Sequence, residues 1–366
     1  MVYYSVPADF TWNTLNEYAQ LNQDYPTAAV RETYGQITQR APTGSGRDIR
    51  LLPCASFAQL AQYIRWSHGV DIQFAYTLNA ICLSNRELHS RTADRLCRFL
   101  QRLENIGVDT LIVAMPSLIE LVKEKGFSFH VKASAVSQIN QPYKARLYRN
   151  LGADSMVLDP DLVRNIPKLQ EVAEAFEGET ELIANNNCTL FCPYKMFHYC
   201  HEAHAAHTRK ETAGESYYFH KCNLMKYETP ASYLKMSWIR PEDIAVYQGC
   251  GVANFKIQGR QDCVKGDIVK TVKAYFEQSY CGNFVHLLTN FNSYHSFLPE
   301  IDNRMLDGFI SPFFEKGFVC SGNCTRCRYC DSYLQKLPNE KALGDLCSLA
   351  REYYIQQSKK RWGKKG

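Results

Sequence analysis

The sequence lacks several patterns that would place it in a common class. Its apolar runs are interrupted by charge or proline well before about 18 residues, so we expect no membrane span. The first residues, MVYYSVPADFTW, contain no basic segment followed by an apolar one, which argues against a secretory signal and for a cytoplasmic protein. GxGxxG and GxxxxGK(S/T) are both absent, which argues against dinucleotide and P-loop sites.

Two hydrolase motifs are missing as well. No GxSxG occurs, and the HEAH of residues 201–204 spaces its histidines three apart, whereas the HExxH zinc motif spaces them four apart. The sequence therefore gives no support to a serine hydrolase or a zinc protease.

Cysteine, by contrast, is abundant, with 15 in 366 residues. A cytosolic chain keeps its thiols reduced, so clustered cysteines there usually mean metal. Two clusters stand out, NNNCTLFCPYKMFHYCHEAH at 185–204 and CSGNCTRCRYC at 320–330. Isolated cysteines are interpreted as small buried hydrophobes or inert surface thiols, namely Cys54, Cys97, Cys263 and Cys347.

The pattern from about residue 70 onward alternates short apolar runs with amphipathic stretches. Helices are expected at 91–107, 116–126, 144–152, 160–176 and 240–251. Strands are expected at 71–80, 109–115, 127–134, 153–159, 180–186 and 252–259, with further candidates at 28–37 and 233–239. Such units form a parallel sheet, and a count near eight favours a closed α/β barrel of the (β/α)8 TIM-like type. We expect this barrel over 1–290, followed over 291–366 by a cysteine-rich C-terminal appendage and a basic tail.

The central cysteines follow an expected strand directly, where a barrel places its ligands. Cys188 and Cys192 form a C-x3-C pair, Cys222 lies in the same excursion, and Cys82 follows another strand end. Four thiolates suit a [4Fe–4S] cluster, and zinc accepts them too. The spacing favours the cluster, because zinc ribbons favour paired C-x2-C knuckles. Cys200 is either a further ligand or part of the helix packing.

The C-terminal group consists of Cys320, Cys324, Cys327 and Cys330, spaced C-x3-C-x2-C-x2-C. Four thiolates within so short a stretch predict a second metal site, either iron–sulfur or zinc. The C-x3-C-x2-C part matches the radical-SAM spacing, but that motif normally follows an early barrel strand, so we do not assign that chemistry.

Four segments together resemble one family. TLNAICLSNRE (77–87), NNNCTLFCPYKMFH (185–198), WIRPEDI (238–244) and FKIQGR (255–260) occur in the order found in the collagenase-like peptidases, peptidase family U thirty-two. The resemblance covers roughly residues 70–335. It implies a barrel that carries a [4Fe–4S] cluster in several members. Characterised branches are oxygen-independent hydroxylases: some act on RNA bases with prephenate as the oxygen source, and heterodimeric ones act on a ubiquinone precursor. Other members are described as collagen-degrading proteases.

The resemblance implies that Cys188, Cys192 and Cys222 hold the cluster. Cys82, Cys200 or a C-terminal cysteine would supply the fourth ligand. This chain departs from the RNA-modifying branch, whose central cysteine spacing is longer, and it adds the C-terminal cysteines. The resemblance therefore supports the presence of a cluster more strongly than it supports any particular substrate.

These features predict an iron–sulfur-dependent, oxygen-independent oxidoreductase. Its substrate would be an RNA base, an aromatic quinone precursor or another small metabolite, with prephenate as a candidate oxygen donor. Such a donor needs fixed cations for its carboxylates. Arg240, Lys256 and Arg260 are the candidates, and Gly259 is expected to permit a tight turn or close approach beside them. Polar groups near the transferred oxygen would be His198, Asn187 or Glu242.

Other interpretations stay open. Arg240 could instead form a rim ion pair with Glu242 or Asp243. A Cys–His pair within 188–204 would serve a peptidase. The chain could also be a non-catalytic iron–sulfur partner of another protein or an electron relay. The basic tail SKKRWGKKG at 358–366 is either a solvated terminus or a contact for RNA phosphates.

Overall fold

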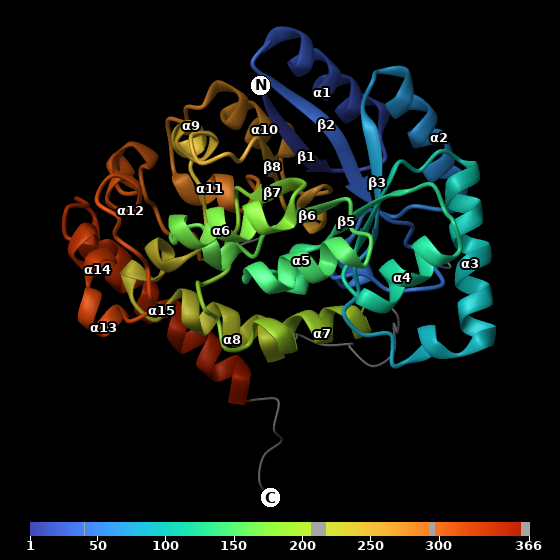
Figure 1. The fold of residues 1–366 in the computed structure, drawn as a ribbon. Coiled ribbons are helices and arrows are strands. Elements are labelled where there is room, and N and C mark those ends of the chain that lie inside the picture. The colour runs from blue at the N-terminus through green and yellow to red at the C-terminus, as the bar shows by residue number, and fades with distance from the viewer. Residues whose placement is uncertain (40, 206–216, 293–296, 360–366) are drawn as a thin grey trace, which may run out of the picture.

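Eight parallel strands close into a barrel in the order β1 to β8 (Figure 1). The structure is a computed structural model that describes residues 1–39, 41–205, 217–292 and 297–359. The closed barrel of eight parallel strands confirms the predicted (β/α)8 architecture. The strands are β1 Val2–Pro7, β2 Ala28–Gly35, β3 Gln73–Leu78, β4 Thr110–Val113, β5 His130–Ala133, β6 Ser155–Val157, β7 Glu179–Ile183 and β8 Asn254–Lys256.

The predicted strands compare closely with these. All six expected segments contain a strand, and the candidate at 28–37 is β2. The candidate at 233–239 forms no strand, because Pro230 begins a 3-10 helix, Pro230–Lys235, whose start is fixed by a capping box between Thr229 and Ser232. The strand that completes the barrel is β1, which sequence analysis did not predict. It pairs with both β2 and β8 and so closes the sheet.

Helices follow most of the strands and wrap the barrel (Figure 1). The predicted ends of α4 are confirmed. Pro116 is its first residue, and Gly126, at φ 72°, follows its last turn. The helices are α1 Trp12–Asp24, α2 Phe57–Gly69, α3 Ser90–Asn105, α4 Pro116–Glu124, α5 Pro142–Asn150, α6 Ile166–Phe176, α7 Lys195–Ala205, α8 Tyr217–Lys226, α9 Ile244–Gln248, α10 Ile268–Glu277, α11 Phe284–Leu288, α12 Ser311–Glu315, α13 Cys324–Cys327, α14 Tyr329–Leu334 and α15 Glu340–Lys359.

The barrel interior is charged in its middle layer. Side chains alternate along each strand, so one set faces the helices and the other faces the barrel axis. Lys132 bridges Glu32 and Glu181, with its Nζ 2.5 Å and 3.3 Å from their Oε1 atoms. Ser5 Oγ donates to Glu32 Oε1 at 2.6 Å, and Lys256 Nζ donates to Ser5 Oγ at 3.2 Å. Two carboxylates and two ammonium groups therefore share one buried network.

The C-terminal helices α12, α13 and α14 gather on one side of the barrel, and α15 runs beside α8 (Figure 1). Helices α14 and α15 belong to a second hydrophobic cluster, in which Trp238, Phe284 and Phe309 pack with Tyr333 and Tyr354, whereas Phe313 of α12 packs in the barrel core. The predicted domain boundary at residue 290 stays a prediction. None of the described helices is long and apolar enough to cross a membrane.

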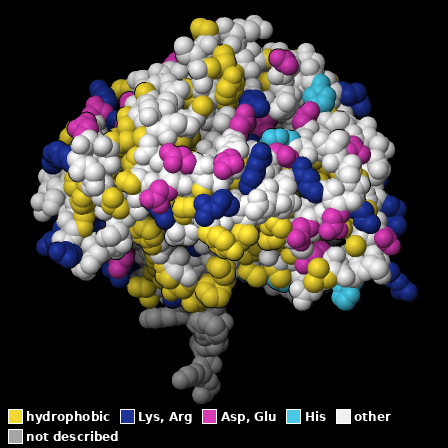
Figure 2. All heavy atoms as spheres, in the orientation of Figure 1, with side chains coloured by type: hydrophobic (Ala, Val, Ile, Leu, Met, Phe, Trp, Pro, Cys, Tyr) yellow, Lys and Arg dark blue, Asp and Glu magenta, His cyan; other side chains and the backbone are white. Residues whose placement is uncertain are grey.

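One face of the molecule carries apolar side chains on its surface. Figure 2 shows them along the lower edge, over α7 and α8. Large exposed ones on these helices are Met196, Phe197 and Phe219. The two helices that flank the central cysteines thus turn apolar side chains outward.

Candidate functional site

A small pocket of about 100 Å³, which we call the rim pocket, lies at the carboxyl ends of the barrel strands. This is the end at which (β/α)8 enzymes carry their active sites. Three cationic side chains line it, and no carboxylate does so among the described residues. Polar groups that line it are Tyr34, Arg47, Thr77, Asn79, Ser134, Asn186, Cys188, His198, Tyr199, Lys256, Gln258 and Arg260.

Arg260 enters the pocket from the turn after β8. Its Nη1 donates to Thr77 Oγ1 at 2.7 Å and Gln36 Oε1 at 3.0 Å, both uncharged partners. Burial lowers the pKa of this guanidinium to about 10. The turn requires Gly259, at φ 124°, because a Cβ there would lie 2.0 Å from Asn290 Nδ2. The arrangement holds a buried positive charge that lacks a carboxylate partner among the described residues, and such a charge favours an anion.

Lys256 connects the pocket to the charged network inside the barrel. Its Nζ lies 3.5 Å from the centre of the Tyr34 ring and 3.8 Å from Glu181 Oε2. Burial lowers its pKa to about 8, and the charge of Lys132 adds to this effect against the opposing pull of Glu181. An ammonium with such a pKa gains and loses its proton near neutral pH, which suits acid–base chemistry.

His198 and Glu202 lie one turn apart on α7, with His198 Nε2 3.4 Å from Glu202 Oε1. Glu202 Oε2 also accepts the backbone N–H of Asp48 at 2.9 Å. Burial would raise the pKa of Glu202, but the hydrogen bond from His198 and the charge of Arg47 lower it to about 2. The carboxylate therefore stays ionised and orients the imidazole at the pocket wall.

The central cysteines meet beside this pocket. Cys188 lines it directly, and its pKa is raised by burial and by the neighbouring thiol of Cys222. Burial also raises the pKa of Cys192, to which Cys222 and Cys188 contribute. The three thiols predicted as one site are thus mutual neighbours. Cys82, predicted with them, lies instead against Cys200.

The C-terminal cysteines surround a second cavity of about 380 Å³. All four line it, and burial raises the pKa of Cys330 to about 11. Another wall of this cavity is the chain at 189–191, between Cys188 and Cys192. Gly322 packs so closely on Phe191 that a Cβ would lie 2.8 Å from its ring. The two cysteine groups therefore lie on either side of one short segment.

The chain is similar to known proteins in sequence and in fold. The model of Peptidase family U32 matches residues 53–312, well over half of the chain. The chain belongs to Peptidase family U32. The uncharacterized protease MJ1657 of Methanocaldococcus jannaschii is 28% identical over 293 residues, covering 80% of this chain and 85% of that protein. The U32 peptidase Mk0906 has a structure that matches with a TM-score of 0.52 at 17% identity, covering 71% of this chain and 93% of that one. At this identity it shows the shared fold.

Three predicted site residues of this U32 protein lie away from the rim pocket. Arg240 is buried, with its Nη2 2.8 Å from Asp307 Oδ1 and its Nε 3.4 Å from Asp243 Oδ2. Glu242 Oε1 accepts the N–H of Tyr280 at 2.7 Å. These contacts match the ion-pair interpretation of Arg240 and join the segment before α9 to the C-terminal half. Asn187 Nδ2 donates to the Leu288 carbonyl at 3.4 Å, and its side chain does not line the pocket.

Several pocket residues were not predicted. Arg47 lies in the loop APTGSGRDIR after β2, where no periodic pattern marks it. The charges of Glu202 and Cys188 raise its pKa against the effect of burial. Asn79 directly follows β3, and Asn186 comes three residues after β7; their place close after a strand was the signal that could have found them.

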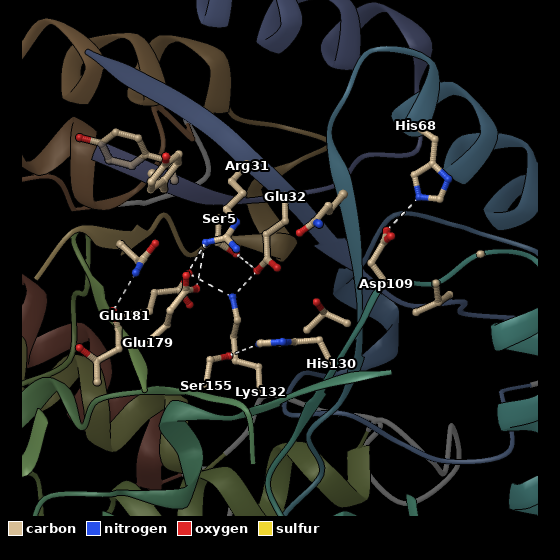
Figure 3. A pocket seen from close by; sticks show the side chains of 18 of the residues that line it. Ser5, Arg31, Glu32, His68, Asp109, His130, Lys132, Ser155, Glu179 and Glu181 are labelled. Atoms are coloured by element: carbon tan, nitrogen blue, oxygen red, sulfur yellow. Dashed lines mark hydrogen bonds and ion pairs between the residues drawn. The ribbon is translucent and has the colours of Figure 1, made fainter. Parts of the chain in front are cut away.

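A larger cavity of about 480 Å³ opens at the opposite, amino ends of the strands (Figure 3). Its charges pair with one another: Arg31 with Glu179 at 2.9 Å, and His68 with Asp109 at 2.9 Å. Figure 3 shows Lys132 between Glu32 and Glu181, and the His68–Asp109 pair apart from it at the right. This end of a (β/α)8 barrel usually serves stability, so we assign no reaction to it.

Proposed function

We propose that this protein is an oxidoreductase that holds an iron–sulfur cluster on Cys188, Cys192 and Cys222 and acts on a small anionic substrate in the rim pocket. The observation that carries the proposal is the pocket lining: Arg47, Lys256 and Arg260 converge there with no carboxylate among the described residues, and Cys188 forms part of the wall.

The three thiols fit a cluster in charge and spacing. The pKa of Cys188 is raised by burial, but the charges of Lys226, Lys195 and Arg47 oppose this rise, so they would offset negative charge on bound thiolates. Thiolates around one tetrahedral zinc at about 2.3 Å lie about 3.8 Å apart. Among the described residues, these three sulfurs do not form a group within 4.8 Å of one another. Thiolates of a cluster bind different irons and stand farther apart than those of one zinc ion.

A bound cluster would supply single electrons or, at an iron that no cysteine ligates, a binding position for a substrate oxygen. The protein's own groups would do the rest. Arg260 and Arg47 would bind carboxylates through their forked N–H groups. Lys256 would hold or release a proton near neutral pH, and His198, oriented by Glu202, would offer a hydrogen bond to the substrate. Prephenate carries suitable charge and is the proposed oxygen donor, for which the pocket would have to widen beyond its volume of about 100 Å³.

A peptidase is the second candidate, because the names of the relatives point to it and because Cys188 and His198 line one pocket. Two observations weigh against it. Burial raises the pKa of Cys188, and a protonated thiol is a poor nucleophile. A pocket of about 100 Å³ suits a small anion rather than an extended polypeptide.

The C-terminal cysteines are proposed as a second metal site, iron–sulfur or zinc. The side chains of the basic tail, proposed as an RNA contact, lie outside the described residues. An electron-relay partner without substrate would share the cluster but would not need three cations in the rim pocket.

The test is anaerobic purification, followed by iron and sulfide quantification and a visible spectrum. Cys188→Ser should lose about four irons per chain, the content of one [4Fe–4S] cluster, while Cys97→Ser on α3 should keep them. The same preparations are then titrated with prephenate and incubated with gelatin. Prephenate binding that Arg260→Gln weakens supports the proposal. An iron-free protein that cleaves gelatin, and stops doing so in Cys188→Ser, would establish the peptidase.

A further inference from the structure

Three metal-binding side chains meet outside the sites described above. The sulfurs of Cys82 and Cys200 and a ring nitrogen of His204 all lie within 4.8 Å of one another. Cys82 belongs to the loop after β3, whereas Cys200 and His204 belong to α7. The fold therefore brings together residues more than a hundred positions apart in the sequence.

The spacing on α7 separates this group from the rim pocket. Cys200 and His204 are four residues apart, so they lie on one face of the helix. His198 and Glu202 are also four residues apart. Each precedes its counterpart in the other pair, Cys200 or His204, by two residues, which corresponds to about 200° around the helix axis. The helix thus turns one pair toward the rim pocket and the other toward Cys82.

The donor set suits a soft divalent ion. Two thiolates and one imidazole bind zinc with one position left for water, as in some catalytic zinc sites. Tetrahedral zinc imposes ligand separations of about 3.3–3.8 Å, so small side-chain rotations would complete the geometry. The backbone N–H of Ser84 donates to Cys82 Sγ at 3.4 Å and so holds this sulfur in place. Cys82 and Cys200 are half-buried and His204 is exposed, which leaves the group open to solvent on one side.

We propose that Cys82, Cys200 and His204 form a zinc site, separate from the cysteine groups proposed for iron. The ion would join the loop after β3 to the outer face of α7 and so position His198 on the other face. This inference does not depend on the proposed function, because it concerns a different set of ligands.

Zinc binding should also release protons. A cysteine thiol that binds no metal is mostly protonated at pH 7. Zinc binds the deprotonated form of each thiol. Addition of zinc sulfate to the metal-free protein in weak buffer at pH 7 should therefore release more protons from the wild type than from Cys200→Ser.

The experiment uses the full chain, purified anaerobically with reductant and equilibrated with zinc sulfate and a competing chelator. Wild type should bind one more zinc per chain than Cys82→Ser, Cys200→Ser or His204→Ala, whose affinity should fall by more than about 100-fold. Cys97→Ser should bind as much zinc as the wild type. Cys188→Ser should retain this zinc whatever its iron content, which separates the result from the proposed function. Cobalt chloride in place of zinc should give a thiolate-to-cobalt absorption band that the three site variants weaken.

Equal zinc in the wild type and all three site variants would overturn the proposal. Loss of iron in place of zinc would do so too, because the group would then belong to a cluster. A Cys82–Cys200 disulfide in the reduced protein, detected as two fewer alkylated thiols by mass, would also overturn it. If a serine variant fails to fold, His204→Ala carries the test, because its side chain is exposed.

Discussion

Replacing Lys132 by methionine should destabilise the barrel in a way that depends on pH. Lys132 is buried between Glu32 and Glu181, and methionine keeps its length without its charge. Burial alone would raise the pKa of Glu32, but the charges of Lys132 and Lys256 and the hydrogen bonds from Lys132 and Ser5 lower it to about 2. Without Lys132 two buried carboxylates would face one remaining ammonium group, that of Lys256.

The free-energy cost of Lys132→Met can be worked out from the burial of the ion pair. Removing one partner of a buried ion pair costs about 3–5 kcal/mol. The lowered pKa of Glu32, about 2 against an ordinary 4.5, corresponds to roughly 3 kcal/mol at 1.36 kcal/mol per unit. With an unfolding entropy of about 2.1 cal/mol/K per residue, 4 kcal/mol lowers the melting temperature of a chain of 366 residues by about 5 °C.

The loss of stability in Lys132→Met should change with pH in a direction that follows from the pKa of Glu32. In the wild type the stabilisation from Glu32 is fully present above pH 4.5 and is lost as the pH falls toward 2. In Lys132→Met, burial should instead raise the pKa of Glu32 above 4.5. The penalty is then largest at pH 8 and shrinks as the carboxylate is protonated near pH 5. Thermal melts at both values should show a gap between wild type and variant that narrows on acidification.

Matched variants complete the assay. Adding Glu32→Gln to Lys132→Met removes one of the facing carboxylates and should recover part of the loss. Lys168→Met breaks a surface pair with Glu171, at 3.1 Å, and should lower the melting temperature by no more than about 1 °C. A gap of equal size at pH 5 and pH 8, unrelieved by Glu32→Gln, would refute the electrostatic account.

Three further outcomes are expected. Arg260→Gln should weaken binding of a dicarboxylate probe by about 10- to 100-fold in calorimetry, because a charged hydrogen bond contributes roughly 1.5–3 kcal/mol; unchanged affinity would place the anion elsewhere. Affinity for that probe should fall as the pH rises through about 8, where Lys256 loses its proton, and Lys256→Met should flatten the profile. Arg240→Ala should cost about 3 kcal/mol of stability, measured by thermal melting, while iron content and anion affinity stay at wild-type values, since its partner Asp307 lies outside the pocket.

Much of the barrel could be predicted because its strands have a clear sequence pattern. β3 to β8 are apolar runs followed by helices or by turn residues, and they appear where the pattern placed them. β1 was missed because MVYYSVP precedes the alternating region and reads equally as an irregular N-terminus. The false strand at 233–239 is apolar for another reason: Leu234 and Trp238 pack in the second hydrophobic cluster.

The site was predictable where strand position and chemistry coincide. Cys188, Lys256 and Arg260 follow or end strands, and the rim pocket contains all three. Arg47 could not be found, because the position of a long loop over the barrel depends on contacts such as Glu202 with the Asp48 amide. The C-x3-H of Cys200 and His204 was visible in the sequence, but only the fold shows that Cys82 approaches it.

The closure of the barrel by β1 has a consequence for how the chain is made. β1 comprises residues 2–7, and its second partner, β8, begins at residue 254. At 5–20 residues per second a ribosome needs roughly 12–50 s to synthesise the intervening chain. One edge of β1 throughout that interval, and one edge of β7 once residues 179–183 have been made, has no native strand to pair with, and unpaired edges invite association with other chains. A nascent chain of this protein is therefore expected to depend on chaperones until residue 256 leaves the exit tunnel, and a product that stops short of it should aggregate.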